Sequence, residues 1–449
     1  MRSKMRVATL AAGALCIALS ASACSGAGGG SSAGDQNSIN VLMVNNPQME
    51  DLQKLTADNF TKDTGIKVNY TVLPENDVRA KISQEFSSQA GQYDVASLSN
   101  YEIPFYSANN WLAPLDNVAK DTQFNQSDIL PAYTASLTGK DGKLYGEPFY
   151  GESSFLMYRK DILDAKGLTM PEKPTWDQVA DLAAKADGAA PGMKGICLRG
   201  QPGWGQVFAP LTTVVNTFGG TWFDKDWNAK VNAPEFTAAT DFYVNLVKQH
   251  GEAGAAQAGF TECLNNMSQS KVAMWYDATS AAGSLEAADS PVKGKIGYVQ
   301  APVKETKSSG WLWTWSWGVQ AASKKQDAAS KFIAWASSKK YEELVASKLG
   351  WAKVPSGKRI STYENAEFQK AAPFFQAERT AIENADPKNP GVQERPVVGI
   401  QFVGIPEFAD LGTTVSQGVS SAIAGQGSVA DALAKGQEAA QKIGDKYKK

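Results

Sequence analysis

An alternation of strand-like and helix-like patterns near the start of the chain constrains its fold most strongly. Ile, Val, Tyr and Val occupy every second position of 66–72, which is typical of a half-buried strand. Shorter strand patterns cover 39–43 and 93–98, and apolar residues at roughly helical spacing fill 49–60 and 78–86 between them. Because strands joined through helices lie parallel in one sheet, this order predicts an α/β fold. The region has no Gly-x-Gly-x-x-Gly turn, so it does not indicate a dinucleotide site.

The beginning of the chain has the pattern of an export signal. Three basic residues are followed by an apolar stretch of signal-peptide length and by small residues just before Cys24. This arrangement resembles a bacterial lipobox, in which the cysteine is lipidated and becomes the mature N-terminus; ordinary cleavage near Ala23 is the alternative. We therefore expect a signal peptide at 1–23 and a lipid-anchored Gly/Ser linker at 24–37. The expected location is the outer face of the cell membrane.

Charge and histidine content exclude several classes of function. Removal of 1–23 takes away three positive charges and changes the formal net charge from −2 to about −5. Without a basic cluster, a nucleic-acid partner is not expected, because such binding depends on many Lys and Arg contacts to phosphate. The single histidine, His250, lies in a polar segment and cannot supply a Ser-His-Asp triad or a typical zinc site. We expect no metal and no cofactor.

Two cysteines remain once Cys16 is lost with the signal and Cys24 is assigned to the lipid. Cys197 and Cys263 are 66 positions apart. In an exported protein such a pair is expected to form a disulfide, which could stabilise the fold by up to ~4 kcal/mol. Two separately buried free thiols are the alternative.

Aromatic and charged residues are concentrated in three stretches, 145–159, 272–279 and 310–318. The third carries tryptophan at every second position from Trp311 to Trp317, so a strand there would present all four indoles on one face. A core rarely needs so many indole N–H groups, each of which requires an acceptor. Sites for carbohydrates and polyols use such surfaces, with rings as walls and charged groups as partners of hydroxyls. A purely structural Trp-rich strand is the alternative.

At this point the chain resembles a known family, the extracellular solute-binding proteins of ABC sugar importers. The likeness covers essentially the whole mature chain and is carried by the export signal, the strand–helix alternation, 151–155 and 271–282. Four longer blocks are similar to the branch that binds mannitol, sorbitol or arabitol: 150–155, 195–205, 215–220 and 401–408.

The resemblance implies a two-lobed, type II periplasmic-binding-protein-like fold. Each lobe would be a mostly parallel sheet flanked by helices, with a hinged cleft between the lobes. The N-terminal lobe would comprise 38–152 and 303–349, and the C-terminal lobe 153–302 and 350–449. The same likeness implies ten candidate ligand contacts: Asn46, Tyr101, Glu102, Glu152, Arg199, Trp275, Asp277, Trp313, Trp351 and Arg359. For the charged members, a structural salt bridge is the alternative.

We therefore expect a binding protein that is not an enzyme. It would capture a sugar alcohol by lobe closure and deliver it to ABC permease subunits, as a monomer held at the membrane by its lipid. The first alternative is the same fold binding another mono- or disaccharide. The second is a secreted glycosidase that uses two of Glu102, Glu152 and Asp277. If Asp277 and Arg199 bind hydroxyls, changing either to Ala should weaken hexitol binding at least tenfold with little effect on the melting temperature.

Overall fold

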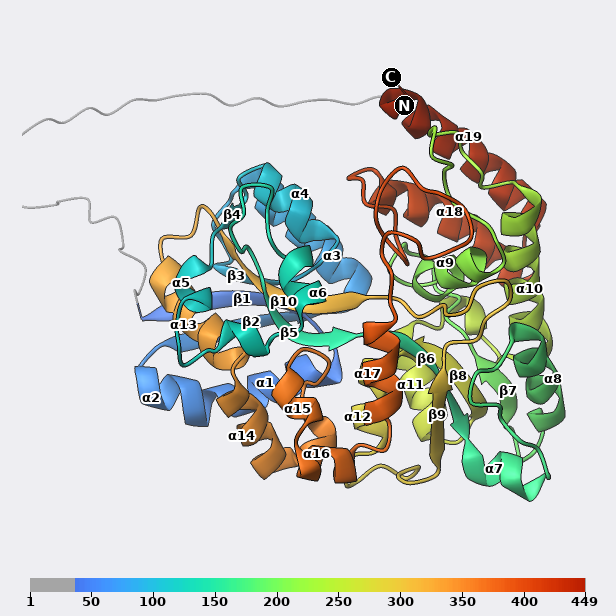
Figure 1. The fold of residues 1–449 in the computed structure, drawn as a ribbon, viewed down its shortest axis with the longest axis horizontal. Helices are drawn as coiled ribbons and strands as arrows, with labels where there is room; N and C mark the ends of the chain where they lie inside the picture. The colour runs from blue at the N-terminus through green and yellow to red at the C-terminus, as the bar shows by residue number, and fades with distance from the viewer. Residues whose placement is uncertain (1–36, 449) are drawn as a thin grey trace, which may run out of the picture. The chain divides into compact units, whose positions relative to one another are not determined.

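The computed structural model describes residues 37–448, which contain two β-sheets, each flanked by helices (Figure 1). We call the sheets with their helices the first and the second lobe. The expected signal peptide, the lipidated Cys24 and all but the last residue of the linker lie outside the described residues. Between residues 37 and 448, no helix combines the length and apolar character that a membrane span needs.

The first lobe is built on a six-stranded sheet with the order β2-β1-β3-β10-β4, and β5 also pairs with β10. The expected βαβαβ unit is confirmed, because β1 lies parallel to both β2 and β3. Strand β10 runs antiparallel to β3, β4 and β5. The strands are β1 (Ser38–Val44), β2 (Lys67–Leu73), β3 (Val95–Ser99), β4 (Leu112–Ala113), β5 (Glu147–Glu152) and β10 (Trp313–Gln320).

The second lobe is built on a four-stranded sheet with the order β7-β8-β6-β9. Strands β7 and β8 are parallel, whereas β6 runs antiparallel to β8 and β9. The strands are β6 (Ser154–Arg159), β7 (Lys194–Cys197), β8 (Val272–Ala278) and β9 (Ile296–Gln300).

Both sheets are therefore mixed, and the expectation of mostly parallel sheets was wrong in this respect. Parallel neighbours need a crossover connection, usually a helix. Strand β6 instead enters its sheet directly from β5 through Ser153, and β10 enters its sheet from the other lobe. Neither strand arrives by a helical crossover within its own sheet, so its direction follows from where the chain enters.

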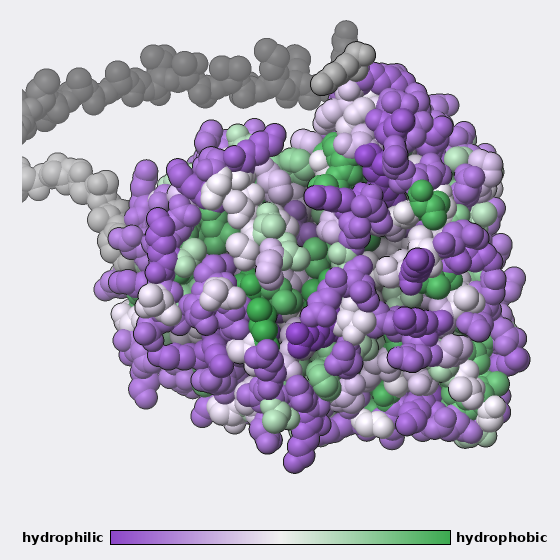
Figure 2. Space-filling view, viewed as in Figure 1, coloured by the Kyte–Doolittle hydropathy of each residue, from purple (hydrophilic) through white to green (hydrophobic). Residues whose placement is uncertain are grey.

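Helices fill the connections and cover the sheets (Figure 1). The C-terminal helix α19 packs against α18 and α10 of the second lobe. The face drawn in Figure 2 is mainly hydrophilic. The helices before β5 are α1 (Pro47–Thr56), α2 (Lys62–Thr64), α3 (Glu75–Ser88), α4 (Glu102–Ala108), α5 (Asp116–Ala119) and α6 (Pro131–Ser136). Those between β6 and β9 are α7 (Lys160–Ala165), α8 (Trp176–Ala186), α9 (Phe208–Thr217), α10 (Pro234–His250), α11 (Phe260–Ser268) and α12 (Ala282–Leu285). Those after β10 are α13 (Gln326–Ala336), α14 (Lys339–Leu349), α15 (Ile360–Tyr363), α16 (Ala366–Ala371), α17 (Phe375–Glu383), α18 (Phe408–Ile423) and α19 (Val429–Tyr447).

The chain passes between the lobes at closely packed backbone segments. Only Ser153 separates β5 from β6, and the chain returns through 301–312 to β10. After α14, Ser356 O accepts a hydrogen bond from Gly151 N at 3.1 Å. Next to it, Gly357 has φ +87°, and a Cβ there would lie 1.9 Å from Gly151 O, so only glycine fits.

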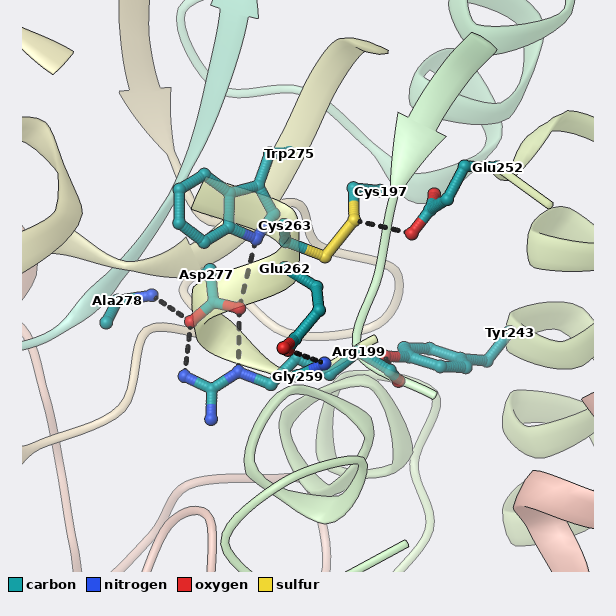
Figure 3. The surroundings of a disulfide bond; sticks show 10 residues. All are labelled: Cys197, Arg199, Tyr243, Glu252, Gly259, Glu262, Cys263, Trp275, Asp277 and Ala278. Carbon is teal, nitrogen blue, oxygen red and sulfur yellow. Dashed lines mark hydrogen bonds and ion pairs between the residues drawn. A yellow bond between two sulfur atoms is a disulfide. The ribbon is translucent and has the colours of Figure 1, made fainter. Parts of the chain in front are cut away.

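The disulfide between Cys197 and Cys263 is present, which confirms that prediction. It joins the end of β7 to helix α11 (Figure 3). Glu252 Oε1 lies 3.0 Å from Cys197 Sγ, and burial raises the pKa of this carboxyl. The bridge therefore ties helix α11, which contributes Phe260 to the cavity described next, to strand β7, which ends two residues before the lining residue Arg199.

Candidate ligand-binding site

A cavity with about 420 Å³ of unoccupied space, counting the part open to solvent, lies where residues of both lobes meet. Two arginines, two glutamates and four tryptophans dominate the lining. The first lobe contributes Asn46, Glu75, Arg79, Glu152, Trp313 and Trp315; the rest of the chain contributes Arg199, Trp204, Gly205, Ala209, Phe260, Ala278, Ser280, Trp311 and Gln401.

Arg79 lies at the centre of the wall formed by the first lobe. Its Nη2 donates to Glu75 Oε1 at 2.9 Å, one helical turn away on α3. Its Nη1 donates to Glu102 Oε1 at 2.7 Å. The two carboxylates raise the pKa of Arg79 above its usual value, although burial acts in the opposite direction. The guanidinium is therefore a fixed positive group at the cavity wall.

Three indoles surround this guanidinium. The Arg79 Cζ atom lies 4.4 Å from the ring centroid of Trp204, 5.0 Å from that of Trp313 and 4.7 Å from that of Trp315. A planar guanidinium stacks favourably on aromatic faces at such distances. Trp204 belongs to the loop after β7 in the second lobe. The contact of Arg79 with Trp204 therefore links the two lobes.

Arg199 forms the charged part of the opposite wall, and Figure 3 shows its pairing with Asp277. Its Nε and Nη2 donate to the two oxygens of Asp277 at 2.8 and 2.6 Å, and its Nη1 donates to Gly205 O at 2.9 Å. Asp277 is fully buried and also accepts hydrogen bonds from Trp275 Nε1 at 3.0 Å and Ala278 N at 2.7 Å. All lone-pair directions of this carboxylate thus face donors, which fixes Arg199 in place.

Glu152 differs from the other acids at the cavity because, within residues 37–448, no basic group pairs with it directly. It ends β5 and accepts a hydrogen bond from Ser280 Oγ at 2.5 Å. Burial raises the pKa of Glu152 to about 8, so its carboxyl is mostly protonated at neutral pH. In this form it can both donate and accept hydrogen bonds.

Glu75 bridges the two lobes at the cavity. Besides its pairing with Arg79, its Oε2 accepts from Gln206 Nε2 at 3.3 Å and lies 3.7 Å from Arg199 Nη1. The residue begins helix α3, where a carboxylate also interacts favourably with the helix dipole. The two arginines of the cavity therefore share one carboxylate.

The ten residues suggested by the sequence fall into three groups. Asn46, Glu152, Arg199 and Trp313 line the cavity. Four lie behind the lining and hold it in place: Tyr101, Glu102, Trp275 and Asp277. Trp351 and Arg359 lie elsewhere.

Arg359 makes structural contacts in the first lobe. It is fully buried, its Nη1 lies 3.2 Å from Asp128 Oδ2, and its Nη2 donates to the carbonyl oxygens of Phe124 and Ser337 at 3.1 and 3.0 Å. These contacts occupy the guanidinium, as the salt-bridge alternative proposes. Trp351 is only partly buried and begins the short turn after α14.

Most of the remaining lining was not identified from the sequence. Trp311, Trp315, Trp204 and Gln401 lie inside stretches that the sequence marks, but single residues within those stretches could not be ranked. Glu75 and Arg79 have the four-residue spacing of an ordinary surface ion pair on a helix, so nothing local distinguishes them. Gly205, Ala278 and Ser280 also lie inside marked stretches, whereas Ala209 and Phe260 lie in none of them.

The strand with the tryptophan repeat is shorter than its sequence pattern. Strand β10 begins at Trp313, so Trp311 lies before it. Trp311, Trp313 and Trp315 line the cavity, whereas Trp317 packs against Phe149 and Phe332 in the core of the first lobe. The tryptophan repeat therefore contributes both to the cavity and to the core of the first lobe, the two roles that its sequence left open.

Comparison with known proteins identifies the family. Residues 45–343 match the family described as bacterial extracellular solute-binding protein. A mannitol-binding protein of Pseudomonas aeruginosa is 38% identical over 403 residues, which cover 89% of this chain and 91% of that protein. A solute-binding protein of Agrobacterium vitis, solved with bound D-mannitol, is 44% identical with a TM-score of 0.89 over 91% of this chain and 99% of its own. A maltose-bound protein of T. maritima, 20% identical with a TM-score of 0.77 over 90% of this chain and 99% of its own, shares the fold. The chain belongs to the bacterial extracellular solute-binding protein family.

Proposed function

We propose that this chain is the substrate-binding protein of an ABC importer and that it captures a sugar alcohol of the mannitol type. The observation that carries the proposal is the cavity itself, in which charged hydrogen-bonding groups alternate with indole walls. The similarity to a mannitol-binding protein and to a structure with bound D-mannitol supports the same ligand class.

The chemistry of a hexitol suits this lining. An acyclic hexitol has hydroxyls along its whole length and no ring face for close stacking, so its recognition depends on hydrogen bonds. Hydrogen bonds to charged groups contribute ~1.5–3 kcal/mol each. Arg79, Arg199 and Glu75 offer such groups, and the protonated Glu152 can exchange donor and acceptor roles with a hydroxyl. The indoles can cover the C–H groups between the hydroxyls.

Lobe closure is the expected mechanism of capture. Since both lobes contribute to the lining, a ligand can form its full set of contacts only when they meet, which shifts the equilibrium toward the closed form. The protein would then deliver the ligand to the permease. Lipidation at Cys24 would keep it at the outer face of the membrane throughout the cycle.

The arrangement of the acids does not favour a glycosidase. The sequence offered three carboxylates for a glycosidase. Glu102 and Asp277 form salt bridges with Arg79 and Arg199, and of the three only Glu152 lines the cavity. Two free carboxyls flanking a bond are what that reaction needs. We therefore propose a role without catalysis.

Calorimetric titration and thermal shift with mannitol, sorbitol, arabitol, glucose and maltose test this proposal. A ligand present at 100 times its Kd stabilises the folded protein by ~2.7 kcal/mol, which is readily measured. Preferential binding of a polyol supports the proposal. Binding of glucose or maltose alone would favour the same fold with another sugar as ligand. Turnover of a chromogenic glycoside would contradict a binding protein without activity.

A further inference from the structure

Two buried polar atoms at the cavity have no hydrogen-bond partner in the described part of the chain. They are the indole Nε1 of Trp311 and the amide Oε1 of Gln401. Trp311 is 1% exposed and Gln401 4% exposed, and both residues line the cavity. One atom is a donor and the other an acceptor. A buried polar group that stays unpaired is unfavourable, so each atom is poised for a partner that the described part of the chain does not supply.

The two arginines that line the cavity, unlike these two atoms, already have hydrogen-bond partners within the protein. The Arg79 guanidinium is held by Glu75 and Glu102, and the Arg199 guanidinium by Asp277 and Gly205 O. A ligand hydroxyl must share these groups with their existing partners. By contrast, Trp311 Nε1 and Gln401 Oε1 can each form a hydrogen bond to a ligand without breaking one.

Both side chains are attached to segments that the structure holds firmly. Trp311 N donates to Ser154 Oγ at 3.2 Å, beside the passage between the lobes. On the other segment, Ile400 O accepts from Asn216 Nδ2 at 2.8 Å, and the Phe402 ring packs against Tyr101 with centroids 5.1 Å apart. These contacts fix the backbone on both sides of Gln401. A ligand therefore meets a pre-positioned donor and acceptor rather than ordering them on arrival.

We propose that Trp311 Nε1 donates to, and Gln401 Oε1 accepts from, hydroxyl groups of the bound polyol, so that this pair selects for hydroxyl groups at defined positions of the ligand. This inference rests on the proposed function and adds to it. A hydroxyl satisfies either atom, since it donates and accepts. A carbonyl oxygen can pair only with Trp311, and a methylene with neither. The pair would thus discriminate a fully hydroxylated chain from deoxy and keto analogues.

The test uses Trp311→Phe, which removes the N–H and keeps an aromatic ring. The matched control is Trp317→Phe. Trp317 Nε1 is also buried without a partner in the described part of the chain, but its ring lies in the core and does not line the cavity. Calorimetric titration with mannitol should show roughly threefold to tenfold weaker binding for Trp311→Phe, as expected for one neutral hydrogen bond. The control should bind within about twofold of the wild type.

Symmetric dideoxy analogues identify the hydroxyl involved. Mannitol has a twofold axis, so a monodeoxy analogue could turn around and hide its missing hydroxyl. The 1,6-, 2,5- and 3,4-dideoxy compounds remove equivalent hydroxyls in pairs and prevent this. For one of the three, the wild type and Trp311→Phe should bind equally, because the contact is already lost. Gln401→Leu should give the same pattern and serves as the second variant if Trp311→Phe fails to fold.

Three results would overturn the assignment. Mannitol affinity unchanged in Trp311→Phe and Gln401→Leu would mean that these atoms face no hydroxyl. Equal losses by the variants for mannitol and for all three analogues would indicate a general disturbance of the cavity. A wild-type protein that binds no polyol would overturn the proposed function and this assignment with it, and the wild-type titration distinguishes that case.

Discussion

Replacing Asp277 by Asn tests the charged wall of the second lobe. Each carboxylate oxygen of Asp277 accepts two hydrogen bonds: Oδ1 from Arg199 Nη2 and Ala278 N, Oδ2 from Arg199 Nε and Trp275 Nε1. An amide keeps the size of the side chain but turns one acceptor into an NH2 donor. Whichever way it rotates, that NH2 group faces two donors. The change therefore removes the negative charge and two of four hydrogen bonds together.

The expected cost follows from burial. Asp277 is 0% exposed and Arg199 4% exposed, so the guanidinium would remain in a buried site without its directly hydrogen-bonded counter-charge, and only the Glu75 carboxylate, 3.7 Å away and shared with Arg79, would be left. Breaking such a pair typically costs ~3–5 kcal/mol. That is a large share of the ~5–15 kcal/mol by which most domains are stable. Because Arg199 lines the cavity, mannitol binding should also weaken at least tenfold. The structure thus replaces the sequence-based expectation that changes at Asp277 would leave the melting temperature nearly unchanged.

Urea unfolding of the ligand-free protein and calorimetric titration with mannitol measure the two effects. Asp181→Asn is the matched control. Asp181 Oδ2 accepts from Lys185 Nζ at 2.6 Å, but the two side chains are 57% and 53% exposed. Exposed pairs contribute about 0–1 kcal/mol, so this variant should change little. Equal losses of stability in the two variants, or unchanged mannitol affinity in Asp277→Asn, would refute the reasoning.

Three further predictions follow from other features. Changing Cys197 and Cys263 together to Ser should lower the free energy of unfolding by up to ~4 kcal/mol, and alkylation of the unreduced wild type followed by intact-mass measurement should reveal no free thiol in this pair. The Glu152 carboxyl has a pKa of about 8 in the fold and 4.5 as an ordinary group, so between these values the folded state binds the extra proton and stability falls as pH rises. Urea unfolding at pH 5 and 8 should therefore show that the stability of the wild type relative to Glu152→Gln decreases with pH; a constant difference would contradict the shift. Changing Cys24 to Ser should release the protein into the medium without altering mannitol affinity, and a variant that fractionates with the membrane would argue against the lipid anchor.

The first strands and helices of the fold were predictable from local patterns, whereas the direction of later strands was not. Over 39–98 the alternation of apolar and polar residues indicates which side chains are buried, and the parallel pairing of β1 with β2 and β3 follows from the helices between them. The direction of β10 depends on where the chain enters the first sheet after its passage through the second lobe. No local pattern encodes that entry point.

The site was predictable to the extent that its residues stand out in their own stretch. Trp313 and Glu152 belong to dense aromatic and charged segments, and both line the cavity. The sequence around Arg79 is that of an ordinary helix and does not mark this residue as part of a site. Its position among three indoles depends on packing between segments more than 100 residues apart. Arg359 carries the right chemistry, but its partner Asp128 lies far away in sequence, so a structural role could not be recognised beforehand.

The indoles around Arg79 also make the cavity an optical reporter. The chain has 12 tryptophans, of which Trp204, Trp311, Trp313 and Trp315 line the cavity. Trp176, Trp222 and Trp275 are fully buried and do not line it, so their emission forms a steady background. A hydroxylated ligand that displaces water beside the four lining indoles changes the polarity around a third of the fluorophores. Intrinsic fluorescence can therefore follow loading and unloading of the unlabelled protein in real time.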